Sequence, residues 1–70
     1  MKDVIISQYL DGEKYYLAID RLDEQIEWIT NYDNANIFND LTAAIKYANK
    51  NLPHMLSGLI FEPLDNPKPR

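Results

Sequence analysis

The fold is decided by residues 25–52, which read QIEWITNYDNANIFNDLTAAIKYANKNL. Apolar residues in the second half of this stretch follow the i, i+3, i+4, i+7, i+11 spacing of one helical stripe. The members of the stripe are Leu41, Ala44, Ile45, Ala48 and Leu52. Asn39 or Asp40 is the expected N-cap, and Pro53 stops the helix because proline cannot continue it. We therefore expect a helix over residues 41–52 that packs its apolar stripe on a sheet.

Two strands are predicted upstream, over residues 3–10 and 14–20. Asp11-Gly12 lies between them and is a strong signal for a tight hairpin turn. A two-residue loop would pair Leu10 with Glu13, Gln8 with Tyr15, Ile6 with Leu17 and Val4 with Ile19. A four-residue loop would change the partners but would leave the same side chains on each face, because side chains alternate along a strand.

This alternation divides the hairpin into two faces. The core face collects Val4, Ile6, Leu10, Tyr15, Leu17 and Ile19. The second face carries Ile5, Ser7, Tyr9, Tyr16 and Ala18. A third strand over residues 25–30 would add Trp28 to the core face and Ile29 to the second face. A sheet covered by one helix should present polar residues outward, so the tyrosines and isoleucines of the second face predict a patch that something covers.

The last predicted strand covers residues 58–61, and Pro63 ends it. If the first three strands alternate in direction and the helix runs back, this strand points the same way as the first and third. We favour the strand order 3-2-1-4 over a position beside the third strand. The expected fold is α+β: an antiparallel three-stranded meander, one helix on one face, and a fourth strand (β-β-β-α-β). Residues 1–63 form the domain, and residues 64–70 form a proline-rich, flexible C-terminal tail.

Charge restricts the partners that the chain can have. The protein has 11 acidic and 7 basic residues, a net charge of −4. Lys68 and Arg70 lie in the tail, so residues 1–66 are more acidic than the whole chain. Such a surface repels phosphate and anionic lipid, which argues against nucleic-acid and membrane partners. The sequence has neither a long apolar run nor a signal peptide, and we expect a cytoplasmic protein.

Catalytic and metal-binding patterns are missing from the sequence. The chain has one histidine, His54, and no cysteine. A nucleophile activated by His54 would have to be Ser7, Ser57 or a threonine, and no motif surrounds either serine. One histidine and dispersed carboxylates give no metal-ligand spacing. We therefore expect neither an enzyme nor a bound cofactor or metal.

Protein binding is the function that the remaining features favour. The candidate partner-binding residues are Tyr9, Tyr16, Ile29, Asp20, Asp23, Glu24, Glu27 and Asp33. The acidic members would steer the protein to a basic or aromatic surface of another protein, and the apolar members would supply contact area. A homodimer formed through the Tyr9/Tyr16 face is the alternative. A third interpretation is that the acidic residues only maintain solubility.

Several segments resemble small uncharacterised proteins of phages and prophages in AT-rich Gram-positive bacteria. They are Tyr15-Tyr16-Leu17-Ala18-Ile19, Glu27-Trp28-Ile29-Thr30, and the residues Ala35, Phe38, Ala44 and Ala48. The resemblance covers about half of the chain and implies a compact strand-hairpin, strand, helix, strand domain. It also implies a gene type that includes inhibitors of host proteins, and it supplies no functional residue.

Overall fold

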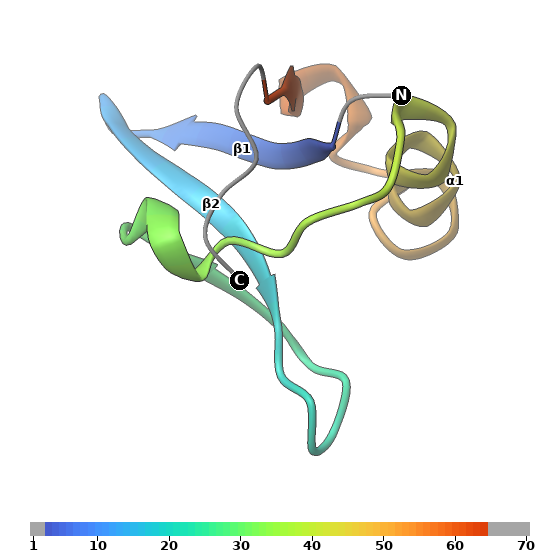
Figure 1. The fold of residues 1–70 in the computed structure, drawn as a ribbon. Helices are drawn as coiled ribbons and strands as arrows, with labels where there is room; N and C mark the ends of the chain where they lie inside the picture. Colours follow the sequence, from blue (N-terminus) through green and yellow to red (C-terminus); the bar gives the residue numbers. More distant parts are fainter. Residues whose placement is uncertain (1–2, 65–70) are drawn as a thin grey trace.

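The computed structural model describes residues 3–64, in which one helix packs on one face of a four-stranded sheet (Figure 1). The elements are β1 (Val4–Leu10), β2 (Glu13–Ile19), β3 (Ile26–Ile29), the 3₁₀ turn η1 (Tyr32–Asn34), α1 (Leu41–Asn51), the 3₁₀ turn η2 (Leu56–Gly58) and β4 (Ile60–Pro63). The strand order is β3-β2-β1-β4, and every neighbouring pair is antiparallel. The α+β class and the favoured order 3-2-1-4 are confirmed.

The turn between β1 and β2 is the predicted two-residue loop. Leu10 pairs with Glu13 and Gln8 with Tyr15. Asp11 and Gly12 both have positive φ, 52° and 83°. Two consecutive residues in the left-handed region form the type I′ turn, whose twist matches that of the flanking strands. The local sequence therefore sets the register of this hairpin.

The predicted pairs Ile6–Leu17 and Val4–Ile19 are wrong, because the β1–β2 ladder stops at Ser7–Tyr16. Beyond that point the two strands separate, and residues 35–38 run between them in an extended conformation. The Asn36 N–H donates to the Leu17 carbonyl at 2.8 Å, while Val4 and Phe38 exchange two backbone hydrogen bonds of 2.9 and 2.8 Å. We call residues 35–38 the inserted segment. Its hydrogen bonds use backbone groups of Val4 and Leu17 that were expected to pair β1 with β2.

The inserted segment also explains why β4 is antiparallel to β1 rather than parallel. At Phe38 the chain forms an antiparallel bridge with Val4 of β1. The chain has therefore already returned to the start of β1 before α1 begins. The helix and η2 then carry the chain toward the Ser7 end of β1, and β4 runs back from Ile60, opposite Ser7, to Pro63, opposite Val4. The prediction assigned the return to the helix and missed this extra extended run.

β4 lies two residues later than predicted, because η2 occupies residues 56–58. Pro63 is the last residue of β4, so the strand ends at this proline as predicted, although Pro63 itself belongs to the ladder. The strand is at the edge of the sheet, where proline is tolerated. Leu64, one residue beyond the expected domain boundary, is buried, and its N–H donates to the Asp3 carbonyl. The rest of the predicted tail lies outside the described residues.

The main core lies between the sheet and α1. Ile6, Leu17, Ala44 and Ala48 have no exposed surface, and the three helix alanines permit close contact between helix and sheet. The predicted helical stripe is partly wrong, since Leu41 and Ile45 are 49% and 39% exposed. The half-buried residues Ala43 and Tyr47 pack against the core instead. Trp28 is on the core face as predicted, but it is only half-buried on the edge strand β3.

The second face of the sheet is partly covered by the chain itself. Ile5 is fully buried beneath Ala35 and Leu64, with Tyr16 and Ile37 packed around them. The prediction that something covers this face is therefore confirmed at Ile5, where the inserted segment and Leu64 supply the cover. Tyr9, farther along β1, remains 58% exposed.

Candidate protein-binding surfaces

Three tyrosines and Lys14 gather on the second face at the edge of the covered part. The Tyr16 and Tyr32 rings meet edge to face, with centroids 5.5 Å apart. The Lys14 ammonium lies 5.5 Å from the centroid of the Tyr16 ring and 5.9 Å from that of Tyr9, within the range of cation–π attraction. Ile29 is directly opposite Tyr16 in the β2–β3 ladder. The structure thus brings Tyr9, Tyr16 and Ile29 to one face, as period-two alternation predicted.

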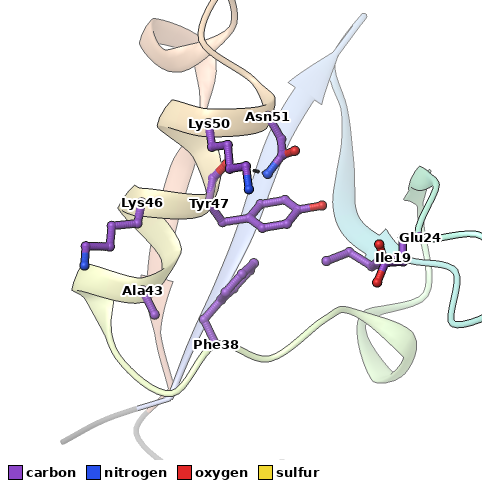
Figure 2. Close-up of a pocket in the computed structure, with 8 residues that line it drawn as sticks. All are labelled: Ile19, Glu24, Phe38, Ala43, Lys46, Tyr47, Lys50 and Asn51. Atoms are coloured by element: carbon purple, nitrogen blue, oxygen red, sulfur yellow. Dashed lines mark hydrogen bonds between the residues drawn. The ribbon is translucent and has the colours of Figure 1, made fainter.

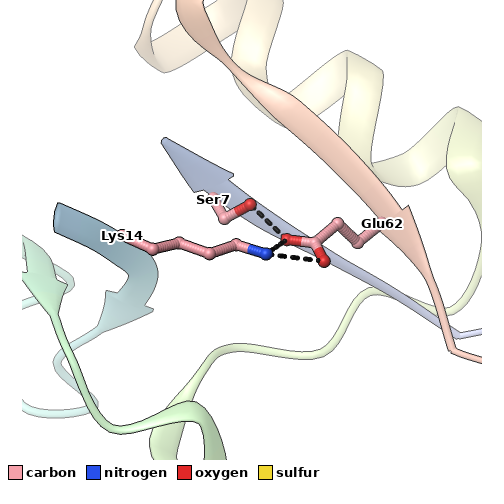
Figure 3. A network of polar contacts seen from close by, with 3 residues as sticks. All are labelled: Ser7, Lys14 and Glu62. Carbon is pink, nitrogen blue, oxygen red and sulfur yellow. Dashed lines mark hydrogen bonds and ion pairs between the residues drawn. The ribbon is translucent and has the colours of Figure 1, made fainter. Parts of the chain in front are cut away.

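A polar network anchors this face (Figure 3). The fully buried Ser7 hydroxyl donates to the Glu62 carboxylate, and Lys14 Nζ lies 3.0 Å from Oε1 and 2.9 Å from Oε2 of the same carboxylate. Burial by itself raises the pKa of Glu62. The hydrogen bonds from Ser7 and Lys14 and the Lys14 charge outweigh burial, so the pKa of Glu62 lies below its ordinary value. The hydrogen bond to Glu62 is the main reason that the pKa of Lys14 is raised. The network joins β1, β2 and β4.

The connection between β2 and β3 is a well-defined loop that projects from the body of the domain (Figure 1). We call residues 20–25 the acidic loop. The Asp20 N–H donates to the Gln25 carbonyl and the Glu24 N–H to the Asp20 carbonyl, both at 2.9 Å. The Asp20 and Asp23 carboxylates accept from the N–H groups of Leu22 and Gln25. Four hydrogen bonds thus hold the backbone of the loop, in which Glu24 lies in the left-handed region at φ 58°.

Leu22 is 96% exposed in the acidic loop. The hydrogen bonds of the loop hold its backbone in place while the apolar side chain contacts almost nothing. Single exposed leucines are common on protein surfaces. One that is nearly fully exposed, on an ordered projecting loop between carboxylates, has the form of an interface anchor.

The predicted acidic residues do not form one surface. Asp20, Asp23 and Glu24 belong to the acidic loop, whereas Glu27 lies opposite Ala18 and so faces the same side as Tyr16. Asp33 is in η1 and lines a second hollow, of about 450 Å³, together with Arg21. Two of the loop carboxylates also hold the loop backbone, so their role is partly structural.

A larger hollow of about 620 Å³ opens between α1 and the acidic loop (Figure 2). We call it the basic hollow; its walls include Ile19, Glu24, Phe38, Lys46, Tyr47 and Lys50. The Phe38 and Tyr47 rings pack with centroids 5.4 Å apart. Figure 2 shows Tyr47 reaching from α1 toward Ile19 and Glu24, with Lys50 beside its ring and Lys46 extending outward from the helix. Burial raises the pKa of the Tyr47 hydroxyl, and the Glu24 carboxylate raises it further.

Sequence reasoning missed both Leu22 and the basic hollow. The carboxylates of the acidic loop were among the candidate binding residues, but Leu22 was not, although one leucine among four charged residues was a visible signal. Lys46 and Lys50 are spaced i, i+4 and flank Tyr47, which predicts a basic helical surface beside an aromatic residue. No sequence signal would have placed Phe38 beneath Tyr47, since that contact depends on the inserted segment.

Within the described part of the chain, no helix is both long enough and apolar enough to cross a membrane. Comparison with protein-family models, with curated proteins and with solved structures finds no match to this chain.

Proposed function

We propose that the protein is a non-catalytic binding module, of the phage-inhibitor type, that uses its acidic loop to occupy an apolar, cation-rimmed surface of a host protein. One observation carries this proposal: Leu22 is 96% exposed on a loop whose backbone is fixed by hydrogen bonds. Burying a leucine of this kind in a partner contributes about 1.5–3 kcal/mol. The loop is already ordered, so binding loses little conformational entropy.

The surrounding carboxylates support the same proposal. Asp20, Asp23 and Glu24 outnumber Arg21 in the loop, and a locally negative surface raises the rate of encounter with a basic partner. Exposed charge pairs add little affinity by themselves. The apolar anchor would therefore provide most of the affinity, and the acidic residues would provide orientation and speed.

The second face supports an alternative, a homodimer through Tyr9 and Tyr16. Tyr9 is 58% exposed, and Ile29 lies beside Tyr16. Tyr16 is already packed against Tyr32 and Lys14, which leaves less free apolar surface there. A stable dimer that is lost in a Tyr16→Glu variant would favour this alternative.

Affinity capture from host lysate, followed by mass spectrometry, tests the binding module. We expect a protein that is retained by the wild type, lost with Leu22→Asp, and retained less with Glu24→Lys and with rising salt. Leu10→Asp is the matched apolar control, since Leu10 is 45% exposed at the other hairpin. Glu13→Lys is the matched charge control. Equal capture by Leu22→Asp and Leu10→Asp would refute the role of the acidic loop.

A further inference from the structure

The basic hollow has no role in the function proposed above. It combines an apolar aromatic wall, from Phe38 and Tyr47, with the cations Lys46 and Lys50 on its helical side. The described residues 3–64 carry only two other lysine or arginine side chains, and one of these, Lys14, is paired with Glu62. In a protein of net charge −4, the hollow thus places two lysines and one carboxylate, that of Glu24, beside an aromatic wall. Tyr47 in this wall is half-buried, and Phe38 is 9% exposed.

The acidic loop has the complementary chemistry. Its six residues, 20–25, include three carboxylates and one arginine, and its apolar tip, Leu22, is 96% exposed. The hollow is on the same side of the molecule, because Glu24 at the root of the loop contributes to the wall of the hollow. The chain therefore carries both an acidic loop with an apolar tip and a hollow with lysines beside an apolar wall.

We propose that the basic hollow binds the acidic loop of a second copy of this chain, with Leu22 of one copy placed against Phe38 and Tyr47 of the other. The exposure of Leu22 excludes insertion into the hollow of its own chain. Loop and hollow are neighbours on the surface. A two-fold axis therefore allows each copy to place its acidic loop in the basic hollow of the other, which gives a closed, isologous dimer. The loop carboxylates would then face Lys46 and Lys50 of the opposite copy.

Dimerisation through the acidic loop is a property beyond the proposed function. In a protein that also binds a host protein through this loop, dimerisation would regulate that binding. A loop that is seated in a second copy is not free for a host protein, so the dimer and the partner-bound form exclude each other. Self-association would keep the exposed leucines covered until a partner with higher affinity displaces the second copy.

Charge exchange between two variants provides a direct test by analytical ultracentrifugation. The loop variant carries Asp23→Asn and Glu24→Lys; the asparagine retains an oxygen that can accept the Gln25 N–H. The helix variant carries Lys46→Glu and Lys50→Glu on exposed positions of α1. We expect the wild type to dimerise between micromolar and millimolar concentration, and each variant alone to dimerise much more weakly. An equimolar mixture should recover dimers, because both loop–hollow contacts in the mixed dimer again join opposite charges. That recovery also shows that both variants are folded.

Leu22→Asp removes two apolar anchors from each dimer, so its dissociation constant should rise by roughly 100- to 10,000-fold. Tyr16→Glu, on the second face, should leave self-association unchanged. A wild type that stays monomeric up to millimolar concentration, or a mixture that remains as weak as its components, would overturn the proposal. Host-protein capture separates this result from the fate of the proposed function, since the helix variant should lose self-association but keep capture.

Discussion

Replacing Ser7 by alanine should destabilise the domain through one buried hydrogen bond. The Ser7 side chain has no exposed surface, and its hydroxyl donates to the Glu62 carboxylate across the β1–β4 ladder. Hydrogen bonds to a charged group contribute about 1.5–3 kcal/mol to stability. Glu62 keeps its contact with Lys14 and is 29% exposed to water, which places the loss near the lower limit. We expect Ser7→Ala to cost about 1.5 kcal/mol, or about 6–12 °C in Tm for a domain of this size.

Urea unfolding followed by Trp28 fluorescence measures this loss, and a double-mutant cycle isolates its cause. The cycle comprises Ser7→Ala, Glu62→Gln and the combined variant. If the hydrogen bond is the reason for the loss, the two substitutions should be coupled by about 1 kcal/mol. Purely additive effects would mean that Ser7→Ala acts through packing, and the reasoning would fail.

The pH dependence gives a second check on the same bond. The folded-state pKa of Glu62 is below its ordinary value. The resulting stability is therefore present above the unfolded-state pKa and is lost as pH falls through the folded-state pKa. Ser7→Ala removes a hydrogen bond to the carboxylate, so the folded-state pKa rises toward the ordinary value. The difference in stability between wild type and Ser7→Ala should shrink on acidification from neutral pH; a constant difference would contradict the assignment.

Two further substitutions test how local sequence sets the elements, with urea unfolding as the assay. Gly12→Ala should cost about 1–2 kcal/mol, because φ is +83° and a Cβ there meets no atom within 4 Å, so only backbone strain is added; Gly58→Ala, which meets equally open space without a positive φ, is the control that should be near neutral. Asp40→Ala should cost about 1 kcal/mol by removing the carboxylate that accepts from the Ala43 N–H at 2.8 Å, whereas an equal loss from Asn39→Ala would show that the cap has been misassigned.

Local patterns predicted the features of the fold that depend on neighbouring residues. Period-two alternation and Asp11-Gly12 were sufficient for the register of the first hairpin, and the apolar spacing was sufficient for α1. The inserted segment was not predictable in this way. Its backbone hydrogen bonds to Val4 and Leu17 join residues far apart in sequence, and its side chains show no period. The sequence of residues 32–39 predicts a single helical turn from which Ala35, Ile37 and Phe38 pack inward. In the structure the 3₁₀ turn ends at Asn34, and the chain is already extended at Ala35.

The candidate surfaces likewise combine features that local sequence sets with features that depend on contacts between residues far apart in the sequence. Tyr9, Tyr16 and Ile29 could be assigned to one face because side-chain direction is a local property of a strand. Which parts of that face are covered could not be assigned, because the cover comes from Ala35 and Leu64. The partner of Lys14 could not be assigned either, since Glu62 reaches it only through β4, whose direction had been predicted incorrectly.

The inserted segment links the error in the fold prediction to the proposed binding surfaces. By separating the first half of β1 from the second half of β2, it turns the end of β2 away from the helix that covers β1 (Figure 1). The resulting space has Phe38 of the segment and Tyr47 of α1 on one side and Ile19 at the end of β2 on the other (Figure 2). A fully paired β1–β2 hairpin would hold Ile19 beside Val4, under the helix, and would draw the acidic loop in with it. Insertion of residues 35–38 therefore accounts for both the basic hollow and the projection of Leu22, because both depend on how far β2 diverges from β1.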